Sequence, residues 1–71
     1  MTVREYCQFA YAANDERKYA VCDFAYFDFP KVNKTFFDAM PFFSPSEWDG
    51  RQERELITFI YMDKERVILF I

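Results

Sequence analysis

Residues 67–71, VILFI, form a run of five apolar side chains without glycine or proline. A short apolar run of this kind is typical of a buried β-strand. Because successive side chains of a strand point to opposite faces of its sheet, this strand is apolar on both faces. We therefore expect it to lie in the centre of a sheet, or else to pair with a strand of another chain.

A second strand is predicted at residues 54–62, RELITFIYM. The four polar residues 63–66 that follow it suit a β-hairpin connection to the strand at 67–71. Both faces of the second strand are again apolar, with Leu56, Ile60 and Met62 on one and Ile57, Phe59 and Tyr61 on the other.

The aromatic stretch KYAVCDFAYFDF, residues 18–29, indicates a long first strand that Pro30 ends. Asp23 interrupts one of its apolar faces. We expect this carboxylate to lie at a margin of the sheet, or to pair with a basic group such as Arg54 or Arg66.

A helix is predicted over residues 3–13. Thr2 and Glu5 have the spacing of a capping box at its start, and Asn14 is a suitable stop. The apolar and small side chains recur at helical spacing: Val3, Tyr6, Cys7, Ala10 and Ala13.

These elements predict one small α+β domain over residues 1–71, with the helix lying across one face of a three-stranded antiparallel sheet. A single helix can cover only one face. The other face must be covered by residues 30–50 or by something outside this chain.

Residues 30–50 are interrupted by prolines, and short helical turns are expected to organise them. Thr35 and Asp38 frame one such turn. Ser44 and Glu47 have the spacing of a second capping box, with a proline at the first helical position between them. Asp49-Gly50 is a turn signal.

The composition argues against most enzyme chemistry. The chain has no histidine, which excludes Ser–His–Asp and Cys–His catalysis and removes the usual nitrogen ligand of metals. With one glycine it cannot form a glycine-rich phosphate loop. The carboxylates show no spacing that favours acid–base work. We therefore predict no catalytic residues, no cofactor and no metal site.

The net charge and the cysteines limit the ligands and the cellular compartment that we expect. A net charge of −3 argues against direct binding of nucleic acid, which needs a basic surface. No apolar run approaches the ~20 residues of a membrane span. No secretory leader follows Met1, so we expect a cytoplasmic protein. Cys7 and Cys22 are then expected as buried thiols, although a disulfide between them is possible.

Aromatic residues make up 23% of the chain: ten Phe, five Tyr and one Trp. A domain of this size cannot easily enclose so many rings, and a contiguous exposed patch usually marks an interface. Phe42, Phe43 and Trp48 either fold back as a lid over the uncovered sheet face or project as anchors for another protein. Neighbouring acidic residues favour a basic partner surface. The predicted interface residues are Tyr26, Asp28, Phe42, Phe43, Glu47, Trp48, Asp49 and Glu53.

The predicted function is a non-catalytic protein-binding module, an inhibitor or adaptor. In size, acidity and lack of catalytic residues the chain is similar to small phage and mobile-element proteins, including anti-CRISPR inhibitors; this is a likeness of type, not of motif. It implies a nuclease or nucleic-acid-binding complex as partner, in the cytoplasm of a host cell. Clustering of Asp28, Glu47, Asp49, Glu53 and Glu55 on one surface would support it.

The alternative is a homo-oligomeric structural protein. Its exposed sheet face, or the strand at residues 67–71, would pair with a second copy of the chain, and no separate ligand would be required.

Overall fold

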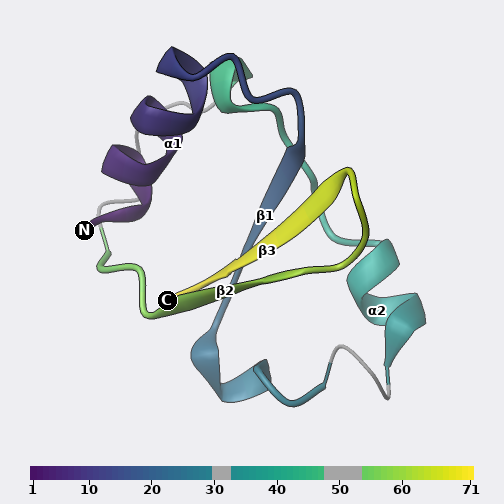
Figure 1. Ribbon diagram of the computed structural model, residues 1–71. Helices are drawn as coiled ribbons and strands as arrows, with labels where there is room; N and C mark the ends of the chain where they lie inside the picture. Colours follow the sequence, from purple (N-terminus) through teal and green to yellow (C-terminus); the bar gives the residue numbers. More distant parts are fainter. Residues whose placement is uncertain (30–32, 48–53) are drawn as a thin grey trace.

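Seven short elements make up the part of the chain that the computed structural model describes, residues 1–29, 33–47 and 54–71 (Figure 1). In chain order they are the helix α1 (Val3–Ala12), the strand β1 (Lys18–Cys22), the 3₁₀ turn η1 (Phe24–Tyr26), the helix α2 (Lys34–Asp38), the 3₁₀ turn η2 (Pro45–Glu47) and the strands β2 (Thr58–Tyr61) and β3 (Arg66–Phe70).

The last strand is the central one. The sheet order is β1-β3-β2, so β3 is paired on both edges within the chain. This confirms the central position predicted from VILFI, and it means that a second copy cannot add to this strand. The α+β class is confirmed as well.

The sheet is mixed, and the prediction of a fully antiparallel sheet is wrong. β3 runs antiparallel to β2 but parallel to β1, with Lys18 opposite Arg66 and Cys22 opposite Phe70. β2 and β3 are antiparallel because a short hairpin joins them. β1 and β3 can be parallel because the long connection between them carries the chain back along the sheet before β3 begins.

The first strand is much shorter than predicted. It ends at Cys22, and Phe24–Tyr26 form η1 instead of continuing the strand. The N–H group of Phe24 donates to the carbonyl of Ile71 at 2.8 Å, and Ile71 in turn donates to Cys22 at 2.9 Å. Residues after 23 therefore have no further β3 residue to pair with, and the chain turns away.

The hairpin between β2 and β3 is confirmed. One carboxylate oxygen of Asp63 accepts the N–H groups of Glu65 and Arg66 at 2.8 and 2.9 Å. The guanidinium of Arg66 forms ion pairs with Asp63 at 2.8 Å and with Asp38 at 2.9 Å, and not with Asp23. Asp23 is exposed just beyond the end of β1, which is the sheet margin that was predicted as its other place.

The capping box at the start of α1 is also confirmed. The Thr2 hydroxyl accepts the N–H of Glu5 at 3.1 Å, and the Glu5 carboxylate accepts the N–H of Thr2 at 3.0 Å. The helix ends at Ala12, one residue before the predicted end, and Asn14 adopts a left-handed φ of 56°. Asparagine tolerates this conformation better than most residues, which suits it as a helix stop.

The two helices lie on opposite faces of the sheet, and each closes a separate small core (Figure 1). Under α1 lie Val3, Cys7, Ala10, Tyr19, Val67, Leu69 and Ile71. On the α2 side lie Ala20, Cys22, Phe37, Ile68 and Phe70. The face that α1 leaves open is thus covered by part of the 30–50 segment, as one of the two predicted arrangements required.

The two cysteines belong to different cores and are both free, so the possible disulfide is not formed. Burial raises the pKa of the Cys7 thiol to about 11, and burial also raises the pKa of Cys22. Both thiols therefore act as small apolar side chains, as predicted.

The central strand sets the stability of the fold, and a matched pair of substitutions tests this. Ile68 on β3 is fully buried, whereas Ile57 is 56% exposed. We expect Ile68→Val to lower the free energy of unfolding by about 0.5–1.5 kcal/mol, because it removes a buried methylene. Ile57→Val should change it by less than about 0.5 kcal/mol. Urea denaturation at low micromolar concentration measures both; equal losses would contradict the burial described above.

Candidate protein-binding surface

Few of the aromatic rings lie inside the fold. Among the described residues only Tyr19, Phe37 and Phe70 are buried rings. Eight are exposed: Phe9, Tyr11, Phe24, Tyr26, Phe29, Phe36, Phe59 and Tyr61. The predicted surplus of ring surface is therefore present, and the question is where it gathers.

Four of the exposed rings come from η1, the residues that follow it, and α2. The ring of Tyr26 lies 5.7 Å from that of Phe29 and 6.1 Å from that of Phe36, measured between centroids. Their side chains are 44–48% exposed, and Phe24 at the start of η1 is 42% exposed. We call these four residues the η1–α2 surface: Phe24, Tyr26, Phe29 and Phe36.

This surface rests on buried rings. Phe36 meets the buried Phe37 edge-on at 5.2 Å. Phe24 stacks on Phe27 at 5.4 Å, and Phe27 meets the buried Phe70 of β3 at 5.2 Å. Phe36 and Phe24 are therefore supported by core rings, and Tyr26 is supported through Phe36, which lowers the entropy that a binding partner would have to remove.

Two exposed carboxylates lie beside this surface among the described residues. Asp23 precedes η1 and Asp28 follows it, both are exposed, and neither carboxylate forms an ion pair with another described residue. Lys34, at the start of α2, is the exposed basic residue nearest in sequence within the described chain. A polar rim around an aromatic centre is typical of a protein interface.

The structure places the predicted interface residues in several locations. Tyr26 and Asp28 lie in or beside the η1–α2 surface. Phe42 and Phe43 are half-buried and pack against the two different cores, Phe42 on the α2 side and Phe43 on the α1 side. Phe43 also pairs with Tyr19 through two backbone hydrogen bonds of 2.8 Å. Phe42 thus has the lid arrangement over the face that α1 leaves open, whereas Phe43 packs on the face that α1 covers; a binding role for either ring stays a prediction.

Glu47 lies at the other end of β1 from η1 (Figure 1). Its carboxylate accepts the hydroxyl hydrogen of Ser44 at 2.6 Å and approaches the ammonium of Lys18 at 3.5 Å. Glu55 forms an ion pair with the N-terminal ammonium at 2.9 Å. Asp28, Glu47 and Glu55 thus belong to separate sites, so the acidic cluster is not formed by its described members. Trp48, Asp49, Gly50 and Glu53 lie outside the described residues.

Sequence reasoning missed Phe24, Phe29 and Phe36. The signal that could have found Phe29 is its spacing of three residues from Tyr26, which places both rings on one side once residues 24–29 turn instead of extending. In α2, Phe36 and Phe37 are adjacent, so one ring must face out when the other faces the core.

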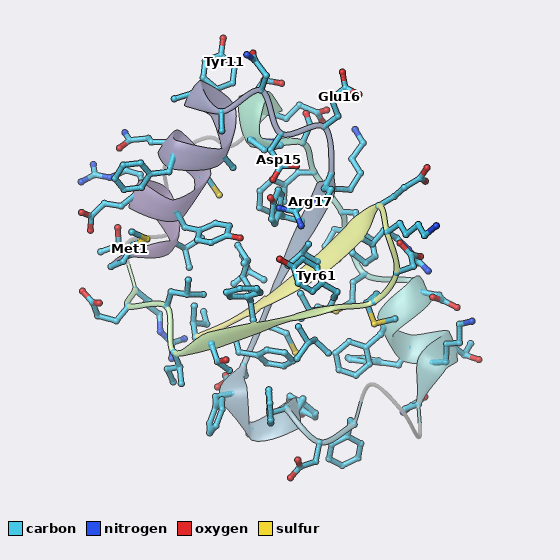
Figure 2. All side chains as sticks on the ribbon, viewed as in Figure 1. Met1, Tyr11, Asp15, Glu16, Arg17 and Tyr61 are labelled. Carbon is cyan, nitrogen blue, oxygen red and sulfur yellow. The ribbon has the colours of Figure 1, made fainter. Side chains whose placement is uncertain are left out.

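A second group of side chains surrounds the guanidinium of Arg17. The guanidinium of Arg17 donates to the carboxylate of Asp15 at 2.6–3.1 Å, the hydroxyl of Tyr19 donates to the same carboxylate, and the guanidinium carbon lies 5.1 Å from the Tyr61 ring centre. Figure 2 shows Arg17 between Asp15 and Tyr61. The Arg17 hydrogen bonds hold the pKa of Asp15 well below its usual range. This cluster joins the loop after α1 to β2 and is a structural contact.

A recess of about 310 Å³ lies between the end of α1 and η2. Its walls are short polar side chains and one proline, together with the ring of Tyr11. Within the described residues, no three Cys, Asp or Glu side chains are placed to hold a metal ion. None of the helices in those ranges is long and apolar enough to cross a membrane.

The fold and surface define a small mixed-sheet α+β domain with a supported aromatic surface. No protein family, no curated protein and no solved structure matches the chain.

The Asp15–Arg17 contact generates a pH prediction. The pKa of Asp15 is lowered in the folded state, so its contribution to stability is present above its unfolded pKa of about 3.9 and is lost as pH falls towards the folded pKa. We expect Asp15→Asn to cost about 1–3 kcal/mol near neutral pH, because it breaks charge-assisted hydrogen bonds of a largely buried carboxylate. Its stability should then decline less steeply than that of wild type below about pH 5.

Urea denaturation at several pH values measures this difference. Ser46→Ala, an exposed change in the neighbouring η2 turn, serves as the control and should keep the wild-type pH dependence. Identical pH slopes for wild type and Asp15→Asn would show that the ion pair contributes nothing to acid stability.

Proposed function

We propose that the protein is a non-catalytic binding module, an inhibitor or adaptor that docks on another protein through the η1–α2 surface. The observation that carries the proposal is a group of three rings in which Tyr26 contacts both Phe29 and Phe36: all three stay 44–48% exposed, and Phe36 rests on the buried Phe37. Exposed rings that are scattered singly need no such explanation, but a contiguous group does.

The exposed area of the four rings limits the binding free energy that they can supply. A ring buries about 150–250 Å² when covered, so the exposed parts of the four rings offer about 350 Å². At about 25 cal/mol per Å² this corresponds to roughly 9 kcal/mol. Association costs an estimated 4–15 kcal/mol. The four rings therefore serve as the centre of an interface, and contacts around them must supply the remainder.

The partner that fits this surface has an apolar hollow with basic residues around it. The exposed carboxylates of Asp23 and Asp28 favour such a rim, and the net charge of −3 favours approach to a basic protein over long range. A nuclease or another nucleic-acid-binding complex has this chemistry, which is also what the likeness to small phage and mobile-element inhibitors implies. The proposed place of action is the cytoplasm of a host cell.

The absence of catalytic work is part of the same proposal. The chain has no histidine. Of its carboxylates, Asp15, Asp63 and Glu55 are engaged in ion pairs within the fold. These ion pairs support a role in which the carboxylates stabilise the fold and perform no reaction on a substrate.

A pair of matched double variants tests the docking surface. We expect Phe29→Ser with Phe36→Ser to weaken binding of a specific partner by at least about thirtyfold, since central ring truncations commonly cost about 2 kcal/mol or more. The control, Phe9→Ser with Tyr11→Ser, removes two rings of α1 that are 63% and 62% exposed and should leave the affinity unchanged.

The measurement begins with capture from a cognate cell lysate and quantitative mass spectrometry, followed by titration of each captured protein against both variants. Circular dichroism melting confirms that both variants remain folded. Raising the salt concentration should slow association if the acidic rim contributes. If the folded Phe29→Ser, Phe36→Ser protein retains every specific partner, the proposed surface is wrong.

A further inference from the structure

We infer that β2 is a self-association edge: two copies of the chain join their β2 strands antiparallel and form a continuous six-stranded sheet. This second surface is independent of the η1–α2 surface. It follows from the direction of the backbone groups of β2, from its side chains and from its charge.

The backbone pairing shows which groups of β2 face outward. The N–H of Lys18 donates to the carbonyl of Glu65, and the N–H of Ile71 donates to the carbonyl of Cys22. The backbone N–H and carbonyl groups of the odd-numbered residues of β3 therefore point towards β1. The backbone groups of the even-numbered residues of β3 then point towards β2, which agrees with the hydrogen bond from the N–H of Met62 to the carbonyl of Arg66 at 2.9 Å. Because these bonds alternate along an antiparallel pair, the backbone groups of Thr58 and Ile60 point towards β3.

The N–H and carbonyl groups of Phe59 and Tyr61 consequently point to the open side of the strand. They have no hydrogen-bond partner among the residues that the structure describes. The opposite edge of the sheet differs, because the outward groups of Tyr19 on β1 are taken by Phe43. The sheet thus has one edge that is partly covered within the chain and one that is open in the described ranges.

The side chains of the open edge do not protect it. Phe59 is 38% exposed, Tyr61 58% and the preceding Ile57 56%. From Leu56 to Met62 the chain carries no charge and no proline. Lysine and proline are two usual means by which an edge strand is kept from pairing, and neither occurs in this stretch. An open, apolar edge of this kind pairs readily with another strand.

A second copy is the occupant that this edge fits best. Copies of a chain with a net charge of −3 repel one another, and a neutral strand is the place where they can approach with least repulsion. Two-fold pairing about Ile60 places Phe59 of each copy opposite Tyr61 of the other, and the outward backbone groups of both then form mutual hydrogen bonds. Cross-strand aromatic pairs of this type are favourable.

The available area indicates a weak dimer. The exposed parts of Ile57, Phe59 and Tyr61 come to roughly 300 Å² per copy, or about 600 Å² for both, before backbone is counted. Stable interfaces bury about 1,200–2,000 Å². We therefore expect reversible pairing with a dissociation constant on the order of 0.1 mM.

Pairing through β2 leaves the η1–α2 surface free. Phe59 and Tyr61 lie opposite Leu69 and Val67, which belong to the core under α1. The η1–α2 surface rests on the other core, through Phe37 and Phe70. A dimer of this form displays two copies of the docking surface, which raises the avidity for a partner with two sites.

Sedimentation velocity from about 20 µM to 1 mM, combined with amide hydrogen exchange at both concentrations, tests the inference. We expect the sedimentation coefficient to rise with concentration. The amides of Phe59 and Tyr61 should gain at least about fivefold protection at the high concentration, while those of Thr58 and Ile60 stay protected throughout. A constant monomer, or a dimer in which the Phe59 and Tyr61 amides exchange as fast as in the monomer, overturns it.

Variants separate this edge from the docking surface. Phe59→Lys places two positive charges close together in the paired edge and should abolish the rise in sedimentation coefficient, whereas Phe9→Lys on α1 should not. The Phe29→Ser, Phe36→Ser protein should dimerise like wild type, so failure of the docking proposal leaves this one standing. If Phe59→Lys dimerises normally, or the Phe29→Ser, Phe36→Ser protein does not, self-association does not occur through β2.

Discussion

The structure depends on one strand that is buried on both faces and paired on both edges. Residues Val67, Ile68, Leu69 and Phe70 of β3 have no exposed surface. Their alternating side chains create two thin cores, one closed by α1 and the other by α2. A chain of 71 residues thereby forms three layers, each too shallow to enclose many large rings. The distribution of aromatic side chains over the surface follows from this arrangement.

The end of the same strand decides where the candidate docking surface forms. Ile71 donates to Cys22 and accepts from Phe24, and these bonds close the ladder. The rings that follow cannot alternate between two sheet faces, because the sheet has ended. They fold into η1 and the turn after it, where Tyr26 contacts the rings of both Phe29 and Phe36. A limit on strand pairing thus becomes a contiguous aromatic surface.

Local patterns in the sequence predicted what local forces determine. The Thr2–Glu5 capping box, the polar hairpin at residues 63–66 and the central position of an all-apolar strand were all predictable, because each depends on neighbours in sequence or on two-face burial. The end of β1 and its parallel direction were not predictable. Both depend on the length of β3 and on the path of the long connection, which are non-local. For the same reason the sequence did not place Phe24, Phe29 and Phe36 beside Tyr26, and the role of Tyr26 and Asp28 in an interface stays a prediction.

The positions of small and large side chains argue that the exposed rings are not a failure of packing. Buried positions of α1 and β1 hold Cys7, Ala10, Ala20 and Cys22, which let the layers approach closely, while rings gather outside. Exposed apolar surface favours aggregation, and a net charge of −3 opposes it. Much of the exposed apolar area outside α1 lies at two places, the uncharged β2 edge and the η1–α2 surface, which belong to different cores. The docking and the self-association that we propose, which the sequence presents as alternatives, would therefore use two different surfaces of one chain and are compatible with each other.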